Sequence, residues 1–264
     1  MLEIKNVSKI FNYGTVNEKK ALDGLNLTLN EGDFVTVIGG NGAGKSTMLN
    51  IVAGVFPVDG GRIIINGEDV TRLPEYKRAK YLGRVFQDPM TGTAATMQID
   101  ENLALAARRG LSRTLRMGIT SRERAEYREL LKQLNLGLED RLSTKVGLLS
   151  GGQRQALTLL MATLKKPDLL LLDEHTAALD PKTAKTVLDI TNQIVTENHL
   201  TTLMITHNMK DALRLGNRII MMHEGRIIFD AEGEEKKKLK VADLLEKFEQ
   251  ASGGEFANDR MMLA

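Results

Sequence analysis

The stretch Gly39-Gly40-Asn41-Gly42-Ala43-Gly44-Lys45-Ser46-Thr47 decides the interpretation of this chain. It fits the pattern GxxxxGK[ST] and lies between the apolar run FVTVI at residues 34–38 and the helix-like STMLNIVAGV at 46–55. Glycines let the backbone curl so that successive N–H groups point at a phosphate, and the following helix adds its positive end. This context predicts a nucleotide-binding loop in which Lys45 contacts the β- and γ-phosphates and Ser46 binds Mg²⁺.

Apolar runs on either side of the loop predict the fold class. FVTVI at 34–38, LLLLD at 169–173 and TLMIT at 202–206 are continuous apolar runs, typical of parallel strands buried on both faces. Residues 2–11, 25–29 and 62–66 instead alternate, which indicates a sheet with one wet face. We therefore expect an α/β phosphate-loop NTPase core, with a parallel catalytic sheet and an antiparallel N-terminal β-subdomain.

The middle of the chain reads as helical. Segments beginning at Ile99, Ser121 and Arg154 have helical apolar spacing, which predicts an inserted helical subdomain. We expect one domain over 1–264. Its catalytic core and β-subdomain comprise 1–88 and 166–233, its helical subdomain 89–165, and its C-terminal helix and tail 234–264. A basic contact from that tail to a membrane or partner is left open.

A second motif predicts the rest of the site. Leu169 to Leu172 are followed by Asp173 and Glu174, as at the end of a strand that delivers a carboxylate to magnesium. Asp173 is the expected ligand. Glu174, one residue on, should point to the other side of an extended chain and polarise the attacking water. A solvated strand end is the alternative.

The segment Leu149-Ser150-Gly151-Gly152-Gln153 precedes another helical run. Ser150 can cap that helix, and two glycines bare the backbone N–H groups beside the cap. This predicts a second anion-binding helix N-terminus. Because one nucleotide has only one γ-phosphate, already held by the loop at 39–47, we expect the second device to serve the nucleotide of another copy.

Composition excludes several classes of protein. Hydrophobic residues make up 42% and charged residues 27% of the 264 residues, so a folded core is expected. A net charge of +2 gives no strong pull toward nucleic acid. Cysteine is absent and the four histidines lack zinc-ligand spacing, which excludes thiolate chemistry and cysteine-bound metal. With no secretory signal and no membrane-spanning apolar run, we expect membrane association only through a partner.

Taken together, these residues resemble the ABC ATPase family along essentially the whole chain. In that family LSGGQ is the diagnostic signature. The resemblance implies that Gln87, in VFQDP, reaches the magnesium site and reports nucleotide state. It likewise implies that Asp180 crosses a dimer interface and that His207 contacts the γ-phosphate and catalytic water. ATP is the implied substrate and Mg²⁺ the implied cofactor.

Two aromatic residues and one histidine lie near these motifs. Phe11 lies where the family places an aromatic that stacks on adenine, and Tyr13 is the alternative. A Phe11 packed in the core is also open. His175 replaces the proline that the family most often has after Glu174; we interpret it as a subfamily variant rather than a metal ligand.

The resemblance also implies a biological role. It predicts the motor of a bacterial importer for a small solute, for example an amino acid, cytoplasmic and held at the inner face of the membrane by a permease. The implied partners are a second copy, the permease and an extracytoplasmic solute-binding protein. An exporter motor and a soluble ABC ATPase of an assembly system remain as alternatives. An ATPase of DNA maintenance would need a long coiled coil before the signature, for which the chain lacks the room.

Overall fold

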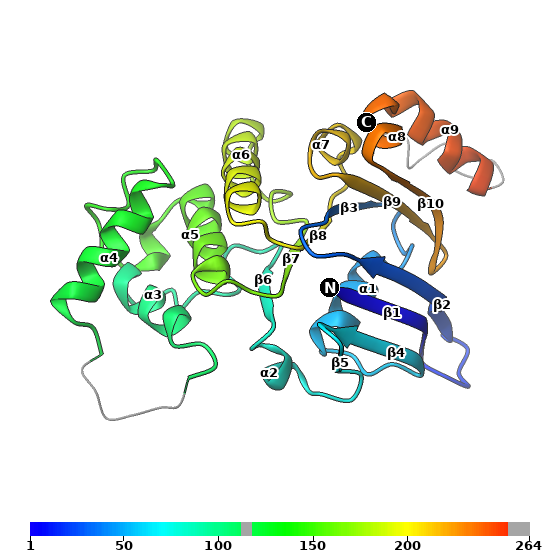
Figure 1. The fold of residues 1–264 in the computed structure, drawn as a ribbon, viewed down its shortest axis with the longest axis horizontal. Coiled ribbons are helices and arrows are strands. Elements are labelled where there is room, and N and C mark those ends of the chain that lie inside the picture. Colours follow the sequence, from blue (N-terminus) through cyan, green and yellow to red (C-terminus); the bar gives the residue numbers. More distant parts are fainter. Residues whose placement is uncertain (112–117, 253–264) are drawn as a thin grey trace.

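A computed structural model describes residues 1–111 and 118–252, so parts of the expected helical subdomain and C-terminal tail lie outside the described residues. Within them, six strands form the central sheet in the order β10-β9-β3-β8-β7-β6 (Figure 1). Their bounds are β3 Phe34–Ile38, β6 Leu82–Val85, β7 Leu169–Asp173, β8 Thr202–Ile205, β9 Arg218–His223 and β10 Arg226–Glu232.

The three strands expected from apolar runs are neighbours in this sheet. β3 pairs with β8 and β8 with β7, all in parallel, as predicted. Their side chains alternate between two cores: Leu169 and Leu171 of β7 join one cluster, while Leu170 and Leu172 join the other. Burial on both faces explains why these strands carry no polar alternation.

Strands β1 Leu2–Phe11, β2 Lys19–Leu29, β4 Gly60–Ile65 and β5 Glu68–Asp69 form the second, antiparallel sheet, ordered β2-β1-β4-β5. This is the predicted β-subdomain. β2 begins at Lys19, well before the expected 25–29. Alternation is interrupted at Asp23-Gly24, where Gly24 has φ +61 and the β1–β2 register shifts.

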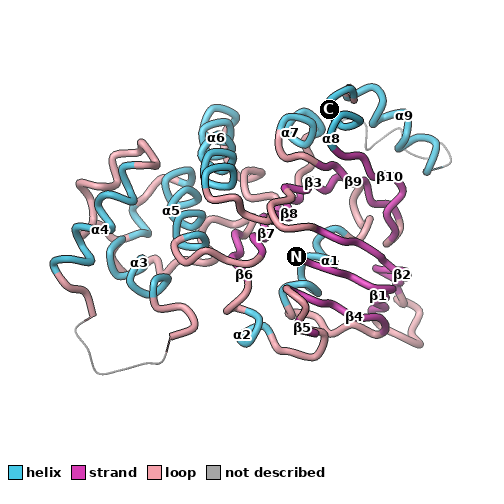
Figure 2. Tube along the Cα trace, in the orientation of Figure 1, coloured by secondary structure: helices cyan, strands magenta, loops and turns pink. Residues whose placement is uncertain are grey.

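Three helices lie together at the β6 end of the central sheet, as Figure 2 shows. They are α3 Ile99–Ala107, α4 Ser121–Lys132 and α5 Gly151–Thr163, with a short 3₁₀ turn at Val146–Leu148. Leu103 of α3, Leu131 of α4 and Leu157 of α5 belong to one buried cluster, which also takes in one face of the sheet. The expected helical region is therefore packed on the catalytic sheet through a continuous apolar core.

The remaining helices are α1 Lys45–Ala53, α2 Glu75–Arg78, α6 Pro181–Glu197, α7 Met209–Arg214, α8 Gly233–Lys238 and α9 Val241–Ser252. α6 was not predicted, although Asp180 caps it and Pro181 opens it in the manner favoured at helix starts. Leu244 and Phe248 of α9 pack with Met209 of α7. No helix in 1–111 or 118–252 is long and apolar enough to cross a membrane.

Candidate functional site

The loop between β3 and α1 has the geometry expected for holding phosphates. β3 is buried throughout and ends at Ile38, and α1 begins at Lys45. The first N–H groups of a helix have no partner inside the helix, so those at the start of α1 are oriented to receive an anion. The Ser46 side chain is exposed at the same helix start.

Gly44 makes this turn possible. It is the residue before α1 and has φ +97, in the left-handed region that other residues rarely adopt. A Cβ atom at Gly44 would lie 2.5 Å from the carbonyl oxygen of Ala21 and 3.0 Å from Leu22 Cδ2. The loop therefore lies directly against β2, and a side chain at this position would push the two apart.

Lys45 is buried at the centre of the loop. Its Nζ donates to the carbonyl oxygens of Gly39 at 2.7 Å and Gly40 at 3.0 Å. Only 5% of the residue is exposed. Lys45 also lines the cleft over the loop, so its ammonium lies where it can pair with a phosphate that enters.

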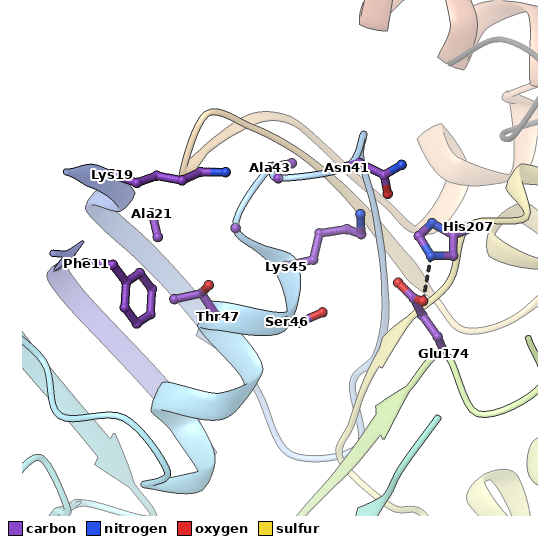
Figure 3. A pocket seen from close by; sticks show the side chains of 12 residues that line it. Phe11, Lys19, Ala21, Asn41, Ala43, Lys45, Ser46, Thr47, Glu174 and His207 are labelled. Atoms are coloured by element: carbon purple, nitrogen blue, oxygen red, sulfur yellow. Dashed lines mark ion pairs between the residues drawn. The ribbon is translucent and has the colours of Figure 1, made fainter. Parts of the chain in front are cut away.

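A cleft of about 400 Å³ opens over this loop. Its described lining residues come from β1, from β2, from the loop and start of α1, and from the ends of β7 and β8 (Figure 3). They are Phe11, Lys19, Ala21, Asn41, Gly42, Ala43, Gly44, Lys45, Ser46, Thr47, Glu174 and His207. The cleft therefore brings together most of the predicted phosphate loop with the expected base and switch histidine.

Phe11 forms one end of the cleft, and Tyr13 does not line it. The Phe11 ring meets Phe56 edge-on, with centroids 5.4 Å apart and an interplanar angle of 83°. Tyr13 is 80% exposed. Lys19 lies opposite Phe11 in the β1–β2 register and also lines the cleft, although it was not predicted. Lys19 could be predicted to line the cleft only if the pairing between β1 and β2 were already known.

Asp173 and Glu174 lie at the carboxyl end of β7, beside the cleft. Asp173 is the last residue of the strand, whereas Glu174 lies beyond it with φ +47. The expectation of an extended backbone at Glu174 is therefore wrong. Instead, the Glu174 backbone N–H donates to Ile205 O at 3.1 Å, and a turn with left-handed φ directs the side chain into the cleft.

Glu174 and His207 are in direct contact. Glu174 Oε2 and His207 Nε2 are 2.5 Å apart, and the Glu174 side chain is 8% exposed while that of His207 is 37% exposed (Figure 3). The carboxylate comes from the end of β7 and the imidazole from just after β8, two neighbouring strands of the sheet. Such a pair can orient and deprotonate a water molecule at the phosphate end of the cleft.

Asp173 is suited to a cation. Burial raises the pKa of its carboxyl above the ordinary value; Arg84 and Lys45 act in the opposite direction, and the Glu174 carboxylate adds to the rise. Arg84 Nη2 is 3.9 Å from Asp173 Oδ2, a distant ion pair. Mg²⁺ commonly uses one or two protein oxygens together with substrate phosphates and waters. The Asp173 carboxylate and the open Ser46 hydroxyl fit that donor set.

The other predicted residues lie outside this cleft. Gln87 follows β6 and is exposed, but it is not among the described lining residues. Ser150 caps α5: the Gln153 N–H donates to Ser150 Oγ at 3.3 Å, and the Ser150 N–H donates to Gln153 Oε1 at 3.2 Å. Asp180 caps α6 by accepting from the Thr183 N–H at 3.1 Å. Thus Ser150, Gly151, Gly152, Gln153 and Asp180 do not line their own chain's cleft.

His175 has a structural environment. It is 1% exposed, and its Nε2 lies 3.0 Å from Thr191 Oγ1, a hydroxyl that donates to Val187 O. His175 Nε2 must then carry the proton, which leaves Nδ1 as a buried acceptor without a hydrogen-bond partner among the described residues. Burial lowers the pKa of His175 to about 4. Within the described residues, no group of three or more histidine or acidic side chains is placed to hold a metal.

Comparisons with known proteins agree with this geometry. A family model described as ABC transporter matches residues 22–177. The chain is 46% identical to the tyrosine transport ATP-binding protein of Clostridioides difficile (strain R20291) over 253 residues, covering 95% of this chain and 100% of that protein.

A spermidine/putrescine import ATP-binding protein of Haemophilus influenzae is 33% identical over 230 residues. That match covers 87% of this chain but only 57% of that protein, so the chain spans little more than half of its length. Among solved structures, a dimeric ATP-binding cassette in a post-hydrolysis state, bound to ADP and Pi, superposes with a TM-score of 0.74. Its sequence identity is 30%, and the match covers 88% of this chain and 98% of that one.

Proposed function

Since the chain belongs to the ABC transporter family of ATP-binding subunits, we propose that two copies of it close head to tail around two ATP molecules and thereby drive a solute through a separate permease. The chain is an importer-like ATPase that converts ATP and water to ADP and phosphate. The observation that carries the proposal is the cleft that joins Phe11, the phosphate loop, Glu174 and His207 but excludes the chain's own Ser150.

Within the cleft, each residue has a distinct proposed task. Phe11 stacks on adenine, and the loop from Gly39 to Thr47 wraps the phosphates. Lys45 neutralises charge that develops on the transferred phosphoryl group. Glu174 accepts a proton from the attacking water while His207, in contact with it, orients that water and the γ-phosphate. Little covalent chemistry is needed beyond this positioning.

The oxygen atoms that the site offers are of the kind that Mg²⁺ prefers. Ser46 and Asp173 would hold it, with Gln87 reaching toward it when the cleft closes. When bound, the ion would neutralise charge at the phosphate oxygens. Asp173 contributes a partly buried carboxylate with a raised pKa, whose negative charge the nearby arginine offsets only at long range.

The signature residues complete the site of the other copy. Ser150, Gly151, Gly152 and Gln153 stand at the N-terminus of α5, where a helix offers N–H groups and a positive dipole end. Asp180 is exposed at the start of α6. A dimeric relative of known structure, whose fold this chain shares, supports the pairing. ATP binding would then close the pair and hydrolysis would reopen it.

We further propose a membrane permease as partner, which would keep the chain at the cytoplasmic face. Asp88–Thr91 forms a segment for the permease to contact, and Met90 is 49% exposed there. Asn102, at the start of the next helix, is 1% exposed and hydrogen-bonds to Ala94 and Gln98, so it supports the segment from behind. We also propose that residues 1–264 form one domain, with a helical subdomain over 89–165.

Identity of 46% to a tyrosine transport protein supports an amino acid as the solute and a solute-binding protein as a further partner. Affinity purification of the tagged chain from native membranes, followed by mass spectrometry, tests this. A polytopic permease together with a solute-binding protein is the expected result. A permease without a binding protein would favour an exporter, and a soluble scaffold would favour an assembly ATPase.

A further inference from the structure

The two signature glycines face different surroundings. Gly151 is exposed, whereas Gly152 is buried. A Cβ atom at Gly152 would lie 2.1 Å from Thr183 Cγ2, far inside van der Waals contact, and 3.6 Å from Thr183 Cβ. A Cβ atom at Gly151 would lie 3.1 Å from Leu179 Cδ2. Gly152 is thus a glycine because a threonine of the neighbouring helix occupies its side-chain space.

Thr183 also holds the turn that carries Asp180. Its backbone N–H donates to Asp180 Oδ1 at 3.1 Å, and hydrogen bonds from the Thr183 side chain and from its backbone lower the pKa of Asp180. Thr183 lies in the first turn of α6, directly after Pro181, whose ring restricts the backbone. Because threonine is β-branched, its χ1 has few favourable settings in a helix, so the methyl group has little room to move away.

The two helices lie side by side in Figure 1, with their N-terminal ends in contact through these residues. Leu179 and Thr183 flank Asp180 in sequence, and each contacts one signature glycine. We call residues 150–153 the signature turn and residues 179–183 the Asp180 turn. The two turns therefore pack directly against each other, and we call this packing the interlock.

We propose that Thr183 is a positioning residue that fixes the signature turn to the Asp180 turn, so that one copy presents both to its partner as a single unit. This rests on the proposed function, in which both turns reach the partner's nucleotide. It assigns Gly152 a packing role, whereas Gly151 and Ser150 remain free to face the phosphate. The interlock sets the spacing between Ser150 and Asp180 before the pair closes.

A suppressor experiment tests this proposal. Gly152→Ala forces a clash with Thr183 and should reduce steady-state ATP turnover roughly tenfold. Thr183→Ala in the same chain removes the obstructing methyl group and should restore turnover to within about threefold of Thr183→Ala alone. Thr186→Ala is the matched control, because Thr186 is exposed one turn further along α6 and should restore nothing. ADP binding to each variant should match wild type, since the phosphate loop is untouched.

Two results would overturn the proposal. If Gly152→Ala/Thr183→Ala is as inactive as Gly152→Ala, the glycine is needed for backbone access to phosphate and not for packing. Thr183→Ala alone should lose roughly threefold in turnover. Wild-type turnover in that variant would show that the interlock does not set the geometry, and this holds even if Gly152→Ala fails to fold.

Failure of the proposed function would look different. Ser150→Arg places a bulky cation on the signature surface without touching Thr183. If Ser150→Arg hydrolysed ATP as fast as wild type, the shared site itself would be wrong. If it is inactive while Thr183→Ala fails to suppress Gly152→Ala, only the positioning role of Thr183 is lost.

Discussion

Glu174 Oε2 and His207 Nε2 lie 2.5 Å apart at the end of the cleft opposite Phe11. Two residues from separate strands thus meet at the position where the γ-phosphate and attacking water are expected. Glu174→Gln should lower turnover at least about a hundredfold, because the amide cannot accept the proton. Phosphate release and binding of a fluorescent ATP analogue separate the two effects: turnover falls and affinity is retained. Normal turnover in this variant would remove Glu174 from the role of base.

Replacing Phe11 and replacing Tyr13 should have different effects on the affinity for ATP. Base stacking on an aromatic ring contributes about 1–3 kcal/mol, so Phe11→Ala should weaken ATP binding by roughly fivefold to a hundredfold. Tyr13→Ala is the matched control, since Tyr13 is 80% exposed and does not line the cleft. Titration of both variants with ATP checks this. Equal losses in the two, or a loss only in Tyr13→Ala, would contradict the assignment.

Arg78 stabilises the helix that carries the phosphate loop. Its guanidinium is buried and donates to the carbonyl oxygens of Ile51, Val52, Thr71 and Leu73, two of which lie in the last turn of α1. Arg78→Met should lower the free energy of unfolding by ~3 kcal/mol, because buried carbonyls lose charged donors. Urea unfolding measures it. The exposed Arg72→Met should stay within about 0.5 kcal/mol, and equal losses would contradict this role.

Because His175 is buried, the free energy of unfolding should fall in acid. Its pKa is lowered by burial from 6.5 to about 4, so the unfolded chain binds a proton between those pH values while the folded chain does not. The neutral ring therefore contributes stability above pH 6.5 that is lost as the pH falls toward 4. The contribution is up to about 3 kcal/mol.

His175→Gln provides the comparison, because glutamine does not titrate. The free energy of unfolding of wild type, minus that of the variant, should decrease from neutral pH to about pH 4. A difference that stays constant over this range would show that the buried ring is not responsible.

Residue patterns predicted the parts of the fold that depend on local chemistry. The parallel strands at 34–38 and 169–173 were evident because both of their faces are buried, so the apolar runs are continuous. The cap of α5 at Ser150 was predicted because serine is favoured before a helix, where its hydroxyl accepts from free N–H groups; the structure adds the reciprocal bond from Gln153.

What could not be predicted depends on contacts between distant segments. Lys19 reaches the cleft through β1–β2 pairing, and Arg78 is buried only because carbonyls of α1 surround it. The left-handed φ of Glu174 follows from its turn after β7 and is not visible in residue type. α6 was missed although its signals were present: a capping aspartate, a first-turn proline and apolar residues at helical spacing such as Val187, Ile190 and Ile194.

We propose that one chain holds only part of a hydrolytic site and that a second copy completes it. Light scattering of the Glu174→Gln protein with Mg²⁺ and either ATP or ADP tests it most directly, since slow hydrolysis preserves the closed state. With ATP the mass should be twice that of one chain, and with ADP it should be that of a single chain. If the ATP-loaded protein stayed a single chain, both alone and with the permease present, the site would not need a second copy.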